Sequence, residues 1–350
     1  MPQRCQDLCF CPAAALWFIN PTSLLALALM TPIFVLGEAL MDCVATPAGL
    51  LHPHVGGSPF NLARAAALRG ASVQFLNRFS EDQFGDQMQA QLARDRVHTV
   101  LGRSRLPTSL AVIQLKDGQP SYGFYREGIA DRDYNVDEVL AALSQVVPGV
   151  LHTGSLMLVP PEHHKVLAVL QGAKAQGWTI SVDVNLRPKL AADLGAYVQA
   201  VKEVAALADW IKASDEDLEL LGFTQPGKGN AADIARTFAA QGASRIALTF
   251  GGDGAWLSVD GQSAQDGVPP VRVVDTVGAG DTFWGNCLAD WTMQPELAGE
   301  RVAQTLHNAM RAAAINCTRA GCQPPTQAEL FGQQQQQQQQ QHQDLPTQQH

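Results

Sequence analysis

The feature that most constrains the fold of this chain is the regular alternation of short apolar runs with longer amphipathic stretches. The short runs have the length and β-branched content of buried strands, and the longer ones repeat apolar residues at helical spacing. This alternation predicts an α/β domain with a mainly parallel sheet that helices cover on both faces. We expect strands at 33–36, 73–76, 150–152, 179–182, 210–212, 245–249, 256–259 and 271–274. We expect helices at 61–68, 84–94, 162–176, 231–241 and 303–317, among others.

One segment interrupts the alternation. Residues 110–115 and 122–126 both have strand character, and the connection between them contains Asp117-Gly118, a hairpin signal. Ligands bind at the carboxyl edge of the sheet in doubly wound folds. The hairpin near 110–126 therefore predicts a small β lid over that edge, which would keep water out of a reaction.

Both ends of the chain are predicted to lie outside the fold. Residues 1–32 contain an apolar run that Pro21 and its neighbours interrupt, so a membrane span is not expected, and a signal cleavage site is not clear. Because Met30 stands just before the first expected strand, residues 1–29 read as an artefact of start-site assignment. Nine consecutive glutamines begin at Gln333, so residues 332–350 are expected to form a disordered tail. The folded domain is therefore placed at 33–331.

Composition excludes some classes of protein. The formal net charge is -9 and no long basic stripe occurs, which argues against a nucleic-acid partner. The seven cysteines form no paired zinc spacing, so we expect free thiols in a reducing cytoplasm. We therefore interpret the chain as a cytoplasmic protein that binds neither nucleic acid nor membrane.

Several conspicuous side chains have a simple explanation. Two histidine pairs have no companion cysteine or carboxylate at zinc spacing and are expected at the surface; they are His52 and His54, and His163 and His164. Arg64 and Arg69 are expected on the solvated face of a helix.

The chemistry concentrates in residues 275–283, Asp-Thr-Val-Gly-Ala-Gly-Asp-Thr-Phe, directly before an apolar run that predicts a helix. A helix start offers unpaired N–H groups and the positive end of the helix dipole to an anion. Glycine lets the backbone approach that anion closely. The carboxylate of Asp281 would repel a phosphate, so we interpret it as a base that takes a proton from an attacking hydroxyl.

Two further features suit a polyol ligand. Gly56 and Gly57 precede a predicted helix that Asn61 opens, so a polyol could lie against bare backbone while the Asn61 amide bonds a hydroxyl. A tight turn before a helix explains the glycine pair equally simply. Asp42 follows the first expected strand and could accept hydrogen bonds from two neighbouring hydroxyls, although a surface turn residue is the alternative.

Taken together, Gly56-Gly57 with Asn61 and the stretch 275–283 resemble the two signature motifs of the PfkB (ribokinase-like) carbohydrate kinase family. The resemblance runs from about residue 33 to residue 330. The Walker A pattern is absent, so a P-loop kinase is excluded. The resemblance implies a ribokinase-like doubly wound, mainly parallel sheet flanked by helices, with a small β-sheet lid. It also implies transfer of the γ-phosphate of ATP to a primary hydroxyl of a small sugar.

The resemblance also implies roles for individual residues. Asp281 matches the catalytic base of the family. The anion hole matches the backbone of Val277, Gly278, Ala279 and Gly280. The sugar-contacting positions match Asp42, Gly57 and Asn61, and a strand-end motif near the phosphates matches Asp183, Asn185 and Arg187. The nucleotide-binding turn matches Thr249, Gly251 and Gly254, and Asn308 resembles an adenine-side residue.

Two cations are implied in the same way. The family usually carries an NxxE motif associated with Mg²⁺, and this chain has Ser214 and Asp217 at the matching positions. Asp217 keeps the negative charge of glutamate on a shorter side chain. A water molecule could bridge the carboxylate and the ion, because Mg²⁺ keeps several of its waters when bound. Many members also bind a monovalent cation such as K⁺ near the anion hole, and Asp275 is its expected neighbour here.

The acceptor is predicted from two stretches. Gly37-Glu38 before Asp42, and residues 124–131 after the lid, most resemble the fructokinase branch, with Arg126 reaching the substrate from the lid side. The 2-keto-3-deoxygluconate kinases share part of this pattern, and there an arginine would pair with the substrate carboxylate. Ribokinase and adenosine kinase fit less well.

Other classes of protein fit less well still. A sugar-sensing protein on the same fold should have lost the base or the anion-hole glycines. A nicotinamide dehydrogenase needs the third glycine of GxGxxG, which Gly278-Ala279-Gly280 lacks. Because lids in this family often pair between subunits, the resemblance also implies a homodimer through the lid.

Overall fold

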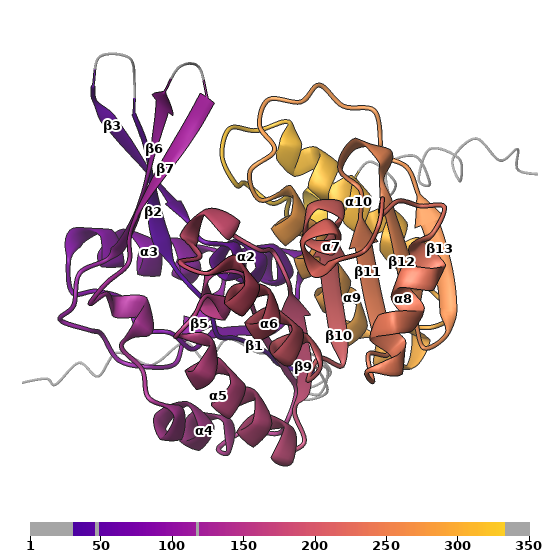
Figure 1. Cartoon of the computed structure of the whole chain (residues 1–350), viewed down its shortest axis with the longest axis horizontal. Helices are drawn as coiled ribbons and strands as arrows, with labels where there is room; N and C mark the ends of the chain where they lie inside the picture. Colours follow the sequence, from indigo (N-terminus) through magenta and orange to yellow (C-terminus); the bar gives the residue numbers. More distant parts are fainter. Residues whose placement is uncertain (1–30, 46–48, 117–118, 333–350) are drawn as a thin grey trace, which may run out of the picture. The chain divides into compact units, whose positions relative to one another are not determined.

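The computed structural model describes residues 31–45, 49–116 and 119–332. The predicted N-terminal extension up to residue 30, the hairpin turn Asp117-Gly118 and the predicted tail from residue 333 lie outside the described residues. Within the described part, the strands form one sheet of nine strands and a second sheet of four (Figure 1).

The large sheet is mainly parallel, as predicted. Its order is β13-β12-β11-β10-β9-β8-β1-β4-β5, and only β12 and β13, at one edge, run antiparallel to their neighbours. The chain winds in one direction from β1 to β5 and in the other from β8, so the switch point lies between β1 and β8, where α/β folds bind ligands. The strands are β1 (Ile33–Val35), β4 (Val73–Phe75), β5 (Val97–Thr99), β8 (Val150–Gly154), β9 (Thr179–Asp183), β10 (Trp210–Ser214), β11 (Arg245–Thr249), β12 (Ala255–Val259) and β13 (Gln262–Asp266).

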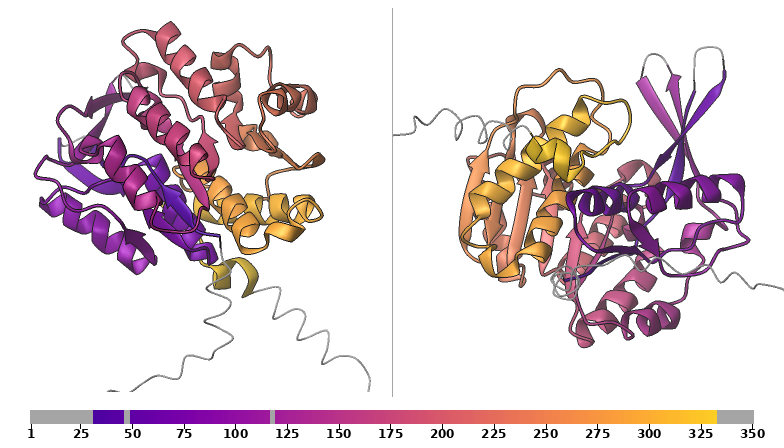
Figure 2. Two further views of the ribbon diagram at one scale, coloured as in Figure 1. Left: turned by 90° about the horizontal axis from the view of Figure 1, so that it is seen from below. Right: turned by 180° about the vertical axis from the view of Figure 1, so that it is seen from behind.

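Helices cover both faces of this sheet, and each face has its own apolar core. Alternation along β1 sends Ile33 and Val35 into one core, and Phe34 with Leu36 into the other. One face carries α4 (Val136–Leu143), α5 (His163–Ala175), α6 (Leu194–Ala205), α7 (Asp215–Leu221) and α8 (Ala231–Ala240). The opposite face, seen from behind in Figure 2, carries α2 (Ser58–Arg69), α3 (Gln83–Arg94), α9 (Ala279–Met293) and α10 (Val302–Cys317). No helix of the described residues is long and apolar enough to cross a membrane.

The lid is larger than the sequence predicts. It contains the expected hairpin, β6 (Ser109–Lys116) and β7 (Gln119–Tyr125), and also β2 (Leu40–Ala45) and β3 (Leu51–Gly56), in the order β3-β2-β6-β7. Figure 1 shows these four strands rising beside the helices. The strands β2 and β3 were not predicted, because polar residues interrupt their apolar pattern; these residues are Asp42, His52 and His54. His52 and His54 are exposed, as expected, and both belong to strand β3.

The prediction of a strand at 271–274 is wrong. These residues form an irregular segment in which Val273 and Val274 are more than half exposed. The backbone N–H groups of Val274 and Asp275 both donate to the carbonyl oxygen of Cys317, the last residue of α10. β-Branched side chains imitate a strand here, but the preceding Pro269-Pro270 cannot donate to a ladder.

Three residues that were expected at the surface are buried. The Arg64 and Arg69 side chains are less than one-tenth exposed, because Asp95 and Asp290 from other elements neutralise them. His163 is buried at the start of α5, with its ring stacked on that of His164. Helical periodicity could not reveal the partners of the two arginines, since Asp95 and Asp290 lie 31 and 221 positions further along the chain.

Helices α2 and α9 pack unusually closely. A methyl group added at Gly285 of α9 would lie 2.8 Å from the carbonyl oxygen of Leu62 and 2.9 Å from the Cβ of Ala65, both on α2. Only glycine lets the two backbones approach to this distance. The approach brings the beginnings of both helices together.

Candidate active site

Asp281 lies where the beginnings of α2 and α9 meet. It is in the first turn of α9 and is only 8% exposed. Ser58 Oγ donates to Asp281 Oδ1 at 2.7 Å, and Asn61 Nδ2 donates to Asp281 Oδ2 at 3.0 Å. The structure therefore brings the predicted base and a predicted sugar-contacting residue into direct contact. Ser58 was not predicted from the sequence, although a small polar residue at the first position of a helix, directly after Gly57, is a recognisable signal.

The surroundings tune the proton affinity of Asp281. Burial raises its pKa above the ordinary value, and the hydrogen bonds from Ser58 and Asn61 and the charges of Lys212 and Arg187 partly oppose that rise. A carboxylate whose pKa is raised is a stronger base than an exposed one. The hydrogen bonds also fix the direction in which its oxygen atoms point.

The start of α9 can receive an anion. Its N-cap is Gly278, whose φ of 73° lies in the left-handed region, and a side chain there would overlap Cys322 Sγ. The Ala279 N–H already donates to the carbonyl oxygen of Thr276 at 3.1 Å. The amides of Gly280 and Asp281 follow in the first turn, where a helix supplies no acceptor of its own. The helix dipole adds positive potential at the same place.

Lys212 lies behind this helix start and was missed by the sequence analysis. Its Nζ donates to Asp183 Oδ1 at 2.8 Å and to Asp183 Oδ2 at 3.0 Å, and both side chains are at most 5% exposed. A methyl group added at Gly280 would lie 3.4 Å from Lys212 Nζ. Burial raises the pKa of Asp183 to about 6, against the opposing charge of Lys212. The available signal was a lysine in the middle of an otherwise apolar central strand.

The loop after β9 reaches the same centre. Asn185 Nδ2 donates to Ser58 Oγ at 2.8 Å, and Arg187 Nη1 donates to Asn185 Oδ1 at 2.6 Å. The two residues thus extend the hydrogen-bonded chain that begins at Asp281. Asn185 has a φ of 38°, in the left-handed region that asparagine tolerates better than most residues.

Asp217, the predicted neighbour of Mg²⁺, supports that loop. Its Oδ1 accepts from the Leu186 N–H at 2.7 Å, and its Oδ2 accepts from both the N–H and the Oγ of Ser214 at 2.8 Å. Together with the bond from the Asp217 N–H to Ser214 Oγ, this forms the capping box of α7. Within the described ranges, no group of three or more His, Cys, Asp or Glu residues is arranged to hold a metal ion.

Asp42 faces the site from the lid. It lies on β2, opposite His54 of β3, and its Oδ2 occupies the space that a side chain on Gly56 would need. Burial raises the pKa of Asp42 to about 6, the charge of Arg187 opposes this, and the charge of Asp281 adds to it. Asp42 and Asp281 are therefore close enough to repel each other, and Arg187 lies near both.

Arg126 lies at the root of the lid and is buried. Its Nη1 donates to the carbonyl oxygen of Leu156 at 3.3 Å, and its Nη2 lies 3.5 Å from Asp131 Oδ2. Glu38 is close by, and burial raises its pKa to about 7. Glu38 Oε1 accepts from the Ser58 N–H at 3.3 Å, so this buried group of charges supports the turn before α2.

The predicted nucleotide side lies at the next strands of the sheet. Thr249 ends β11 and pairs with Ser214 of β10. The Phe250 N–H donates to the Gly254 carbonyl oxygen at 2.8 Å and closes the turn that contains Gly251. Asn308 is buried on α10 and accepts from Gln304 Nε2 at 2.9 Å.

Asp275 connects the helix start to the loop after α10. Its Oδ1 accepts from the Val277 N–H at 3.0 Å, and its Oδ2 accepts from the Gly321 N–H at 2.8 Å. Asn316 strengthens the same connection, because its Nδ2 donates to the Val277 carbonyl oxygen at 2.8 Å. The loop of residues 318–323 therefore supports the segment that leads into Gly278.

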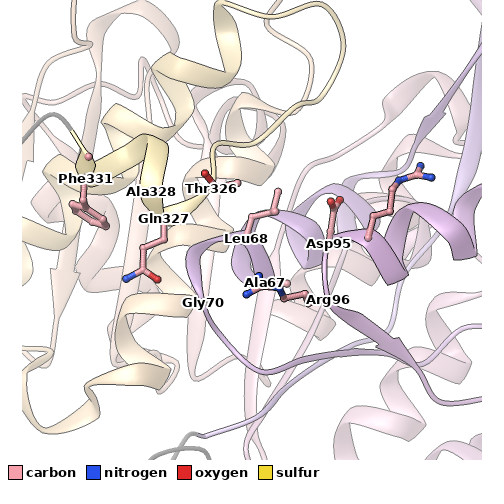
Figure 3. A pocket seen from close by; sticks show the side chains of 11 residues that line it. Ala67, Leu68, Gly70, Asp95, Arg96, Thr326, Gln327, Ala328 and Phe331 are labelled. Carbon is pink, nitrogen blue, oxygen red and sulfur yellow. The ribbon is translucent and has the colours of Figure 1, made fainter. Parts of the chain in front are cut away.

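A cavity of about 780 Å³ lies elsewhere, between the ends of α2 and α3 and the C-terminal residues 326–332. Figure 3 shows Phe331 on one side of this cavity and Asp95 on the other. A second cavity, of about 580 Å³, lies along α10 and includes His307 and Val271. Neither cavity is lined by Asp281 or by the residues bonded to it, so the centre is recognised by its chemistry.

Comparison with known proteins agrees with these features. Residues 30–329 match the model of the pfkB family carbohydrate kinases. A fructokinase of Rhizobium leguminosarum bv. trifolii is 31% identical over 280 residues, covering 79% of this chain and 84% of that protein. A fructokinase of Vibrio alginolyticus is 30% identical over 315 residues, covering 86% and 98% respectively. The crystal structure of a fructokinase with bound ATP from Xylella fastidiosa is 27% identical, covers 88% of this chain and 99% of that one, and superposes with a TM-score of 0.76.

The two glycines before α2 should respond differently to substitution. Gly57 has a φ of 111°, and a methyl group there would lie 2.5 Å from the backbone oxygen of Glu38, so Gly57→Ala should lower the free energy of unfolding by about 1–3 kcal/mol. Gly56→Ala meets only the carboxylate of Asp42, which can rotate away, so its cost should stay within about 1 kcal/mol. Urea unfolding of both variants measures the difference between their free energies of unfolding. An equal loss of stability in Gly56→Ala and Gly57→Ala would show that the left-handed backbone and close contact of Gly57 do not require glycine.

Proposed function

Because the chain belongs to the pfkB family of carbohydrate kinases, we propose that it is a fructokinase, which transfers the γ-phosphate of ATP to a primary hydroxyl of fructose. The chain is an ATP-dependent sugar kinase. The observation that carries the proposal is the position of Asp281, held between Ser58 and Asn61 in the first turn of a helix that begins with Gly278-Ala279-Gly280.

In the proposed reaction the sugar hydroxyl lies against Asp281. The carboxylate takes the hydroxyl proton while the sugar oxygen attacks the γ-phosphorus in line; the new O–P bond forms as the bond from the phosphorus to the ADP oxygen breaks. Ser58 and Asn61 keep the carboxylate in place during this step. Asp42 would accept hydrogen bonds from other sugar hydroxyls on the lid side.

The negative charge of the transferring group would be stabilised from the opposite side. The amides of Gly280 and Asp281 lie in the first turn of α9, where the helix supplies no acceptor, and such preorganised donors need no rearrangement during the reaction. The Lys212 ammonium, paired with Asp183, lies behind Gly280. In an acidic protein, this local arrangement supplies the positive potential that the surface lacks.

We place ATP along Thr249, Gly251, Gly254 and Asn308. Mg²⁺, when bound, would neutralise part of the negative charge of the ATP phosphates. Both oxygens of Asp217 already accept hydrogen bonds, so Asp217 suits a contact to the ion through water, and Mg²⁺ keeps waters readily. K⁺ would bind beside Asp275, where the loop of residues 318–323 meets the segment leading into the anion hole.

The geometry favours an uncharged sugar over 2-keto-3-deoxygluconate. The positive charge of Arg126 is already matched by Asp131 at 3.5 Å, with Glu38 nearby, so it is poorly placed to pair with a substrate carboxylate. Asp42 would repel such a carboxylate on the lid side. A sugar sensor without activity is disfavoured because the chain keeps both the base and the anion-hole glycines.

We also propose that the kinase domain spans residues 33–331, that the protein works in the cytoplasm, and that it forms a homodimer through the lid. Among the described side chains of its strands, Leu51 and Tyr125 are 49% and 64% exposed and lie on one face of the lid sheet, and Val44, 41% exposed, lies on the other face. Exposed apolar side chains on both faces of the lid support the proposed contact between subunits. Sedimentation velocity of the full-length protein should show a dimer that Leu51→Glu weakens; a wild-type monomer at micromolar concentrations would rule the dimer out.

An ATP-consumption screen over fructose, 2-keto-3-deoxygluconate, ribose and adenosine, with and without K⁺, tests the substrate. Fructose should give the highest kcat/KM.

The role of Asp281 is tested by the variant Asp281→Asn, which should lower kcat by about 10²–10⁴-fold while sugar binding survives. Because burial raises the pKa of Asp281, its ionised form costs stability at neutral pH, so Asp281→Asn should melt at or above the wild-type temperature. Normal turnover in this variant would remove Asp281 from the role of base.

The affinity for fructose should depend on pH through Asp42. Its pKa of about 6 means that the carboxylate becomes protonated as the pH falls below that value and loses part of its capacity to accept hydrogen bonds. The KM for fructose should therefore rise between pH 7 and pH 5, while the KM for ATP changes less. Asp42→Asn, which does not titrate, should show a high KM without this trend; an unchanged trend in that variant would assign the titration to another group.

A further inference from the structure

Arg64 is a buried cation for which the proposed reaction has no use. It lies on α2, three positions after Asn61, and its side chain is 9% exposed. Its Nε donates to Asp95 Oδ2 at 2.6 Å, and its Nη1 donates to the carbonyl oxygen of Cys322 at 3.1 Å. Burying a guanidinium costs free energy even when it is paired, and apolar packing often replaces such a pair without loss. Its two different acceptors point to a positional role.

Cys322 belongs to the loop that supports the anion hole. The Gly321 N–H of this loop donates directly to Asp275. The Gln323 N–H donates to Asn316 of α10, which in turn donates to the Val277 carbonyl oxygen. The Cys322 side chain packs directly against Gly278, where no side chain would fit. Any displacement of Cys322 would therefore shift Gly278, which belongs to the anion hole.

The same helix holds the base. Ser58 and Asn61, in the first turn of α2, bond both oxygens of Asp281, and Arg64 lies one turn further along. Helix α2 thus contacts the base directly and the anion hole through Cys322. The spacing between the base and the anion hole determines whether the sugar oxygen and the phosphorus meet in line.

We propose that Arg64 is a positioning residue that keeps the anion hole in register with Asp281, by holding the Cys322 carbonyl while Asp95 orients the guanidinium. The inference rests on the proposed kinase function. Arginine suits this task because its rigid fork can bond a carboxylate and a carbonyl at once, which an ammonium group does less well. Asp95 is itself fixed, since Gln91 Nε2 donates to the same oxygen at 2.9 Å, and it stands at the end of α3 beside the cavity of Figure 3.

The helix also offers a matched control. Arg69 lies five positions further along α2, has a side chain that is 8% exposed and pairs with Asp290 at 3.2 Å. Its guanidinium also stacks on the ring of Phe331, away from the loop of residues 318–323. Arg64→Met and Arg69→Met therefore both remove a buried arginine from the same helix, and only Arg64→Met removes the bond to Cys322.

The first readout is steady-state kinetics on the full-length protein, at a temperature where both variants remain folded. Arg64→Met should lower kcat by about tenfold or more, with the KM for fructose nearly unchanged, because a misplaced anion hole affects the transition state more than sugar binding. Arg69→Met should keep the wild-type kcat, and Arg64→Lys should recover part of the loss. Equal kcat values for Arg64→Met and Arg69→Met would overturn the proposal.

The second readout needs no substrate. Iodoacetamide labelling of Cys322, followed by peptide mass spectrometry, reports how often the loop opens. Labelling should be several times faster in Arg64→Met than in the wild type or Arg69→Met, and Asp95→Asn should change it in the same direction if Arg64→Met does not fold. Unchanged labelling in these variants would refute the role of Arg64, whereas a wild type that phosphorylates no sugar would refute the proposed function alone.

Discussion

The contact between Asp281 and the first turn of α2 is the interaction on which the rest of the site depends. Two hydrogen bonds, from Ser58 and Asn61, join residues that lie more than two hundred positions away in the chain. They can form because Gly285 lets the backbones of α9 and α2 approach each other closely. The same packing that builds one apolar core of the domain thus also places a carboxylate beside an anion-binding helix start.

Around this contact the domain buries several charges, and it pairs each of them across elements. Lys212 meets Asp183 behind the anion hole, Arg126 meets Asp131 at the root of the lid, and Arg64 meets Asp95 beside α2. Buried pairs contribute little net stability but hold a definite geometry, since leaving either partner alone is costly. The first two pairs support the site, because Lys212 lies behind Gly280 and Arg126 lies beside Glu38, which accepts a hydrogen bond from the Ser58 N–H.

The elements that were predicted well are those with a strong local signal. The parallel strands and long helices follow from apolar periodicity, and residues 275–283 combine glycines, a helix start and a carboxylate in one short stretch. Predictions failed where local and tertiary signals differ. Val271–Val274 has strand-like residues but no strand partner in the structure, and the lid strand β3 has strand partners but polar, proline-containing sequence.

The sequence alone determined the α/β architecture, the candidate base Asp281 and the glycines that suit an anion, since each depends on residues that are neighbours in the chain. Only the tertiary structure decided that Ser58 holds the base, that Lys212 stands behind Gly280, that Arg64 is buried and bonded to Cys322, and that Asp217 caps a helix. Hydrogen bonds and ion pairs act over about 3 Å in space, and the local sequence around a residue does not indicate a partner that is distant in the chain. Such partners can be identified only after the helices and strands have been packed together.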